Sequence, residues 1–203
     1  ELMARLNAGR RLVAMQRDLA ERTESVTAAY NSLRTMHDLM ERDLRMAGSF
    51  MAAAFPPRLT QYGLVTVAAA CLPCDHVGGD LVGHFPAGPD RIGAFAIDVS
   101  GHGVASGLYA MSLARLFDRV DALSNIATAI GIDGLPVPRD PAEVVAGLNA
   151  RCLDGGHDLY FTMALATLDL ATGEGRLCRA GHPEPLIVGA GGAVRRIREG
   201  GPP

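Results

Sequence analysis

The sequence predicts an α+β fold in which a long N-terminal helix precedes a domain built on antiparallel strands. The first observation is that residues 1–55 contain no proline and are rich in Leu, Met, Ala, Arg and Glu. The second is that strand-like runs beyond residue 56 are joined by short turns containing glycine. The third is that two helical segments lie together between groups of strands instead of alternating with them. This order is typical of an antiparallel sheet and not of βαβ units.

The composition of the chain narrows the classes of protein to which it can belong. Of the 203 residues, 48% are hydrophobic and 20% are charged, which is sufficient for a folded core. The net charge of −3 gives no electrostatic argument for a nucleic-acid partner. No apolar run reaches the roughly 18 residues needed to span a bilayer, so no membrane partner is expected for this stretch. Four cysteines without regular spacing indicate a reducing compartment, and we expect a cytoplasmic location.

The N-terminal helix carries a heptad pattern. When positions are counted from Leu12 in alternating steps of three and four, all are apolar except Arg22 and Asp43. The positions are Leu12, Met15, Leu19, Arg22, Val26, Ala29, Leu33, Met36, Met40, Asp43, Ala47 and Phe50. A seam of this length predicts a coiled coil.

A coiled-coil helix cannot bury its seam alone, so we expect a homodimer through this helix. The alternative, in which the seam packs back onto the domain, stays open. Pro56 and Pro57 end the helix. We therefore divide the chain into a dimerisation and signalling helix, residues 1–55, and a second domain, residues 56–203.

The second domain is expected to contain strands, two helices and further strands. A capping pattern at Asp140, Pro141 and Glu143 marks the start of the second helix. We expect strands over residues 62–73, 81–85, 91–98, 161–170, 175–182, 185–190 and 193–199, and helices over residues 104–130 and 140–153.

Two aspartates form the first candidate site. Asp98 ends an apolar strand, where a carboxylate needs a cation or hydrogen-bond donors. Asp80 follows two glycines at the start of the preceding strand of a predicted hairpin. Two carboxylates at adjacent strand ends suit a hard divalent cation. Two alternatives remain open: both residues are solvated turn aspartates, or Asp98 caps the helix that follows it.

Two further motifs indicate a function less specifically than the two aspartates do. The glycines of residues 101–107 suggest a dinucleotide-binding turn, but their spacing is irregular and no parallel βαβ unit follows. His102, within this turn, is either a pocket residue or an ordinary turn residue. Cys71 and Cys74 form a CxxC that lacks a second pair for zinc and a helix start for redox chemistry, which favours two ordinary thiols.

Five segments together resemble a known family. GGD (78–80), DVSGHGVASGLYAM (98–111), DPAEVVAGLN (140–149), FTMALATLDLATGEGRLCRAGHPEPLIV (161–188) and GGPP (200–203) follow the order found in bacterial SpoIIE-like phosphatases. These enzymes belong to the metal-dependent PPM superfamily of protein serine/threonine phosphatases. The resemblance covers roughly residues 45–203. It implies an αββα sandwich of antiparallel sheets that holds two Mn²⁺ or Mg²⁺ ions.

The resemblance also implies roles for individual residues. Asp98 matches the aspartate that bridges both metals, Asp80 matches the ligand of the second metal, and the backbone carbonyl of Val99 matches a main-chain ligand. The residues that would line the pocket are Gly79, Gly101, His102, Gly103 and His182. The implied substrate is phosphoserine or phosphothreonine on an anti-anti-sigma (STAS-type) protein. The coiled coil would carry input from an upstream sensor or receiver domain.

The family's sequences continue beyond GGPP with further metal-ligating aspartates. We therefore expect this stretch to be C-terminally truncated and, by itself, weak or inactive as an enzyme. Two alternatives follow. One is a catalytically incomplete dimeric signalling module that keeps the fold and binds a partner. The other is a nucleotide-binding enzyme built around the glycine turn.

Overall fold

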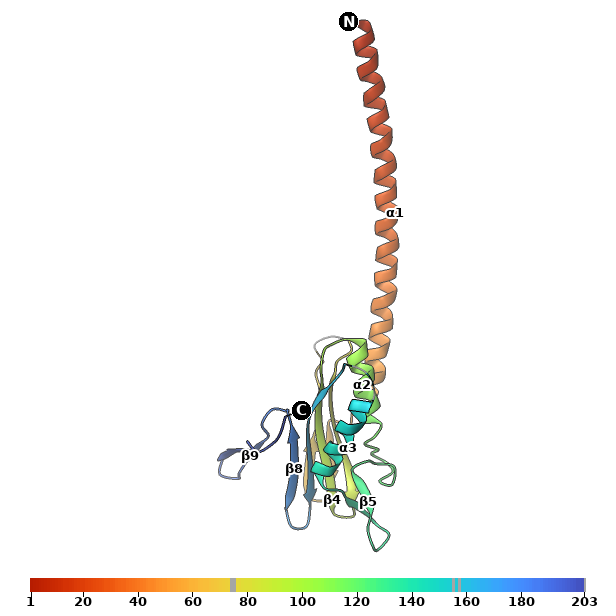
Figure 1. Ribbon diagram of the computed structural model, residues 1–203. Helices are drawn as coiled ribbons and strands as arrows, with labels where there is room; N and C mark the ends of the chain where they lie inside the picture. Colours follow the sequence, from red (N-terminus) through yellow and green to blue (C-terminus); the bar gives the residue numbers. More distant parts are fainter. Residues whose placement is uncertain (74–75, 155, 157, 203) are drawn as a thin grey trace. The chain divides into compact units, whose positions relative to one another are not determined.

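A computed structural model describes residues 1–73, 76–154, 156 and 158–202. The chain divides into two compact units, Glu1–Met46 and Ala47–Pro203. Helix α1 (Leu2–Ala54) ends directly before Phe55 and the two prolines, as the sequence predicts (Figure 1). Within the described residues, no helix has an apolar stretch long enough to cross a lipid bilayer.

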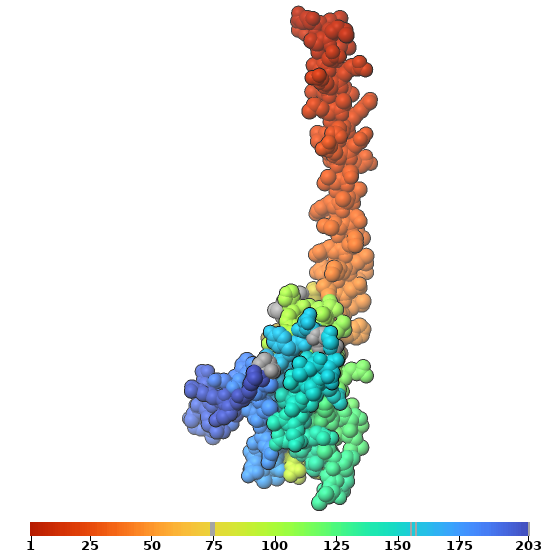
Figure 2. Space-filling view, viewed as in Figure 1, coloured from red at the N-terminus to blue at the C-terminus, as the bar shows by residue number. Residues whose placement is uncertain are grey.

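The predicted seam of α1 is exposed to solvent along the helix. Leu33 and Met36, for example, are 70% and 67% exposed. Figure 2 shows the side chains of this helix in red and orange. Apolar side chains in this arrangement need a partner surface, and the coiled-coil dimer stays a prediction.

The second unit is built on a four-stranded antiparallel sheet with the order β3-β4-β7-β8 (Figure 1). The strands are β3 (Asp80–Gly88), β4 (Arg91–Val99), β7 (Phe161–Asp169) and β8 (Gly175–Ala180). Each of the hairpins β3–β4 and β7–β8 is closed by a short turn, and an irregularity between Pro86 and Gly88 shifts the register of β3–β4. The α+β class with antiparallel sheets after a long N-terminal helix is therefore confirmed.

One face of this sheet packs against two helices, α2 (Val104–Ala114) and α3 (Pro141–Asp154). The core between them centres on Phe85, Phe95 and Phe117, and the rings of Phe95 and Phe117 stack with centroids 4.3 Å apart. Gly83 lies opposite Phe95, and Gly93 lies opposite Phe85. A Cβ at either glycine would come within 2.3 Å of the facing ring, so each ring occupies the space that the absent side chain leaves.

The helix predicted over residues 104–130 is wrong in its length. Helix α2 ends at Ala114, and β5 (Thr128–Ile130) pairs with β6 (Pro136–Pro138). Between them, the Asp118 carboxylate accepts hydrogen bonds from the backbone N–H groups of Val120 (2.7 Å) and Asp121 (2.9 Å). The amide of Asn125 donates to the Asp118 carbonyl at 2.7 Å. Short polar side chains here satisfy backbone groups that a longer helix would use itself.

Most of the remaining segments agree with the prediction from the sequence. Asp140 caps α3, because its carboxylate accepts a hydrogen bond from Ala142 N at 2.9 Å. The hairpin β9 (Leu186–Val188) and β10 (Val194–Arg196) is also as predicted. The prediction of a single strand over residues 62–73 is wrong. Gly63 adopts φ +57°, and the chain turns there between β1 (Leu59–Tyr62) and β2 (Val65–Ala68).

Candidate metal centre

The two predicted aspartates face each other across the sheet. In the β3–β4 hairpin, Asp80 is the direct register partner of Asp98. Both carboxylates are exposed, and they alternate with Leu81 and Ile97, which are buried toward the helices. The carboxylates therefore stand on the sheet face opposite α2 and α3. The prediction that neighbouring strands bring Asp80 and Asp98 together is confirmed by this register.

The electrostatics of the pair suit a bound cation. Burial, and then the charge and a hydrogen bond of the Asp98 carboxylate, raise the pKa of Asp80, while the nearby His182 opposes the shift. Two like charges that strand pairing holds close together repel each other unless a cation or a proton lies between them. Carboxylate oxygens are the ligands that Mg²⁺ and Mn²⁺ prefer. The donor set therefore fits divalent metal ions.

The Val99 carbonyl lies against Gly79, the residue before Asp80, because Gly79 carries no side chain. A Cβ on Gly79 would come within 2.6 Å of the Val99 oxygen, and Val99 N donates to Gly79 O at 3.3 Å. Past Val99, the backbone turns through Gly101 and Gly103, whose φ angles are +83° and +84°. These left-handed conformations favour glycine and let the chain turn from β4 directly into α2.

His102 lies between those two glycines and is exposed. It shares the turn with the candidate ligands, but no side-chain contact of His102 with Asp80 or Asp98 is seen in the described part of the chain. The strand pairing excludes the dinucleotide-binding interpretation of this turn. Strand β4 pairs antiparallel with both β3 and β7, so it belongs to no parallel βαβ unit.

A third strand adds two residues to the site. Thr162, on β7, is the register partner of Asp98, so Asp80, Asp98 and Thr162 form a row across three strands. The Thr162 hydroxyl lies 2.8 Å from Nδ1 of His182, in the turn after β8. Burial lowers the pKa of His182, against the opposing charges of Asp98 and Asp80. His182 was a predicted pocket residue, whereas Thr162 was not.

Thr162 was missed because the signal for it is not local. The residue is one polar side chain at the start of an apolar strand, more than sixty positions after Asp98. Only the pairing of β4 with β7 makes them neighbours. The register of a hairpin with a short turn can be estimated from sequence, but the register between distant strands cannot.

Cys71 lies beside Asp80, and its Sγ donates a hydrogen bond to the Asp80 carbonyl at 3.8 Å. Cys74 lies outside the described residues. Cys71 is a free thiol, and burial, followed by the charge of Asp80, raises its pKa. A raised pKa keeps the thiol protonated, which makes a reactive thiolate at Cys71 unfavourable. Cys152 and Cys178 are also free.

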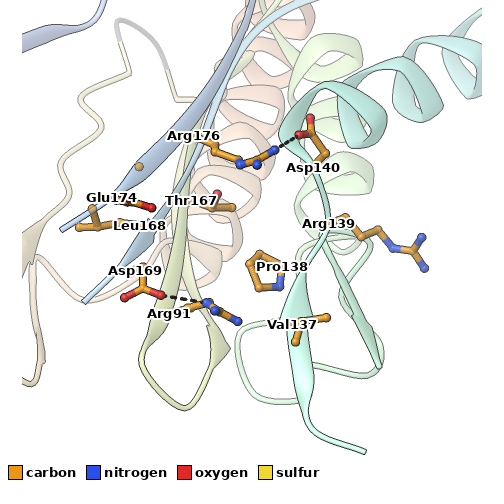
Figure 3. Close-up of a pocket in the computed structure, with 11 residues that line it drawn as sticks. Arg91, Val137, Pro138, Arg139, Asp140, Thr167, Leu168, Asp169, Glu174 and Arg176 are labelled. Carbon is orange, nitrogen blue, oxygen red and sulfur yellow. Dashed lines mark hydrogen bonds and ion pairs between the residues drawn. The ribbon is translucent and has the colours of Figure 1, made fainter. Parts of the chain in front are cut away.

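A hollow of about 510 Å³ lies at the other end of the sheet (Figure 3). It is crossed by two ion pairs, Arg91–Asp169 at 3.2 Å and Arg176–Asp140 at 2.8 Å. Arg91 is the first residue of β4 and Asp98 is near its end, so this hollow is separate from the carboxylate pair. These ion pairs engage four of its charged groups, and Arg139 donates to the Thr128 carbonyl at 2.8 Å. We assign the hollow no role in catalysis.

The sheet domain matches the family model of a signalling phosphatase. Residues 88–203 match the family model of stage II sporulation protein E, SpoIIE. The match covers more than half of the chain, and the chain therefore belongs to the SpoIIE family. Asp98, Val99 and His182 lie within the matched residues, whereas Asp80 lies before them. Phosphatases of this type use divalent metal ions.

The comparison with solved structures finds the crystal structure of the RsbU and RsbW domains of Rv1364c from Mycobacterium tuberculosis. The sequence identity is 28% and the TM-score is 0.44. The alignment covers 62% of this chain and 32% of that chain, so the match spans about a third of its length. No curated protein matches the sequence.

Proposed function

We propose that this chain is a metal-dependent protein phosphatase that hydrolyses phosphoserine or phosphothreonine on an anti-anti-sigma (STAS-type) protein. The observation that carries the proposal is the direct register pairing of Asp80 and Asp98. Membership of the SpoIIE family supports the phosphatase class. Burial and then the charge of Asp98 raise the pKa of Asp80, and a cation at this place would offset the repulsion between the two carboxylates.

The proposed cofactors are two Mn²⁺ or Mg²⁺ ions. Asp98 lies between Asp80 on β3 and Thr162 on β7, and this central position suits a ligand shared by both ions. Asp80 would hold the second ion, and the Val99 carbonyl would add a main-chain oxygen. When bound, the ions supply a water nucleophile of lowered pKa and positive charge for the phosphoryl oxygens.

The surrounding residues keep this end of the sheet open to a phosphorylated side chain. Gly79 holds no side chain against the Val99 carbonyl. Gly101 and Gly103 form a turn without bulky groups, and exposed His102 stands between them, where a phosphoprotein can contact it. His182 approaches the pair from the opposite side through Thr162. The chain thereby binds and orients the phosphoryl group between two turns.

We further propose that residues 1–55 form a coiled-coil dimer that relays input from an upstream sensor or receiver domain to residues 56–203. The exposed apolar seam of α1 supports this division. Because the proposed substrate regulates a sigma factor, the phosphatase would act in the cytoplasm. Free thiols at Cys71, Cys152 and Cys178 agree with a reducing compartment.

Phosphate release by the metal-free full chain, before and after addition of Mn²⁺, tests the proposal. A phosphoserine-bearing anti-anti-sigma protein serves as substrate, and we expect release only with Mn²⁺. Asp98→Asn should abolish release and weaken Mn²⁺ binding in calorimetry. Asp90→Asn, an exposed change at the far end of the same hairpin, is the matched control. A chain that neither binds Mn²⁺ nor releases phosphate would instead be a non-catalytic partner-binding module.

A further inference from the structure

His182 is held beside the carboxylate pair by its ring and by its main chain. Nδ1 of the ring lies 2.8 Å from the Thr162 hydroxyl. The main-chain carbonyl accepts a hydrogen bond from Nη1 of Arg179 at 2.9 Å. A ring held by one hydrogen bond on a main chain held by another has less rotational freedom to lose when it binds a ligand.

Arg179 itself joins two distant parts of the chain. Besides the carbonyl of His182, its guanidinium donates to the carbonyls of Arg198 (Nη2, 2.7 Å) and Glu199 (Nε, 3.3 Å). The planar fork of arginine is suited to several acceptors at once, and a lysine could not reproduce this geometry. The turn that carries His182 is therefore tied to residues 198 and 199.

The backbone reinforces the same connection. Gly181 N donates to Gly201 O at 2.9 Å, and Gly201 N donates to Arg179 O at 3.0 Å. A Cβ on Gly200 would come within 2.7 Å of the Arg179 guanidinium. The paired glycines thus let the chain pass directly over Arg179, and the histidine turn and this segment form one unit.

Two tautomers of the His182 ring are compatible with its hydrogen bond to Thr162. Thr162 occupies Nδ1, and in the described part of the chain no hydrogen bond to Nε2 is seen. In one of these tautomers the Thr162 hydroxyl donates to Nδ1 and the ring proton lies on Nε2, which makes Nε2–H available as a hydrogen-bond donor.

His182 is not placed as a third metal ligand. In the described residues, a set of His, Cys, Asp or Glu ligand atoms lying within 4.8 Å of one another occurs only at His37, Asp38 and Glu41, on exposed α1. Asp80, Asp98 and His182 do not form such a set.

We infer that His182 donates a hydrogen bond from Nε2–H to a phosphoryl oxygen of the substrate, with Thr162 fixing the tautomer and Arg179 fixing the turn. The substrate contact rests on the proposed function. A donor already oriented toward developing negative charge lowers the barrier because no reorganisation is needed during the reaction. His182 is accordingly the catalytic residue, and Thr162 and Arg179 are positioning residues.

The tautomer is measured without metal or substrate. Long-range ¹H–¹⁵N correlation spectra of the full chain, with the His182 signal assigned by its loss in His182→Gln, should show the proton on Nε2. Thr162→Val removes the hydroxyl and should leave a mixture of tautomers, whereas Thr162→Ser should restore the wild-type spectrum. A proton on Nδ1 in the wild type would overturn the inference, because Nε2 would then be an acceptor.

The substrate contact is measured with Mn²⁺ and a phosphoserine protein. His182→Ala should lower kcat by about 100-fold, as for other lost donors to developing charge, and leave the Mn²⁺ dissociation constant unchanged. Asp90→Asn, in the turn of the β3–β4 hairpin, is the control. An unchanged kcat, or a loss of Mn²⁺ affinity equal to the loss of rate, refutes the inference while the phosphatase proposal stands. An inactive wild-type chain refutes the proposed function and the substrate contact, but not the tautomer.

Discussion

Replacing Asp80 by Asn should stabilise the metal-free chain and remove its response to metal. Directly opposed residues in an antiparallel pair have Cβ atoms about 5 Å apart, and two unit charges at that distance in a water-like medium repel by about 1 kcal/mol. Both side chains are exposed, so this low estimate applies. For a chain of this size, 1 kcal/mol corresponds to a rise in Tm of about 2–4 °C.

Thermal unfolding in EDTA and in Mn²⁺ measures both effects. In EDTA, Asp80→Asn should melt above the wild type, whereas Asp90→Asn, in the turn of the same hairpin, should not. In Mn²⁺ at about 100 times the dissociation constant, the wild type should gain about 2.7 kcal/mol and the variant much less. Equal melting temperatures of the two variants in EDTA would show that the carboxylates do not repel. A full Mn²⁺ shift in Asp80→Asn would show that the metal binds elsewhere.

Three further predictions follow from the fold. Phe117→Ala removes a ring from the aromatic core and should cost about 3–5 kcal/mol in urea unfolding, whereas Val120→Ala, at a side chain that is 95% exposed, should change stability by less than about 0.5 kcal/mol. Hydrogen bonds from the backbone N–H groups of Asp121 and Val120 hold the pKa of Asp118 below its usual value of 3.8. The ionised carboxylate of Asp118 therefore stabilises the fold above pH 3.8, and this stabilisation is lost as the pH falls through the lowered pKa. Asp118→Asn should therefore flatten the decrease of Tm on acidification. Deleting residues 1–45 should convert a dimer into a monomer in light scattering, and a monomeric full chain would contradict the coiled coil.

The parts of the site that depend on neighbouring residues could be predicted from the sequence. Asp80 and Asp98 belong to strands joined by one short turn, so a hairpin brings them together, and an irregularity between Pro86 and Gly88 shifts their register by one residue. Gly101 and Gly103 also predict a turn at this position, because few other residues adopt the left-handed conformation that the turn requires. Here the local conformational preference and the tertiary structure agree.

The parts that depend on distant residues could not be predicted in this way. Thr162 joins the site only through the pairing of β4 with β7, and Arg179 acts on carbonyls about twenty positions ahead in the chain. The helix after Gly103 was predicted too long because its apolar periodicity continues past Ala114. Asp118 and Asn125 override that periodicity with side-chain hydrogen bonds to the backbone.

The double glycine near the end of the described chain should control His182 from a distance. A methyl group at Gly200 would collide with the Arg179 guanidinium, which holds the carbonyl of His182. Gly200→Ala should therefore broaden or split the His182 ring signals, even though residue 200 contacts neither the ring nor the carboxylates. Gly191→Ala, in the β9–β10 turn, where a Cβ meets nothing within 4 Å, should leave those signals unchanged. If both variants gave the wild-type spectrum, Arg179 would not transmit the position of this segment to His182, and Thr162 alone would orient the ring.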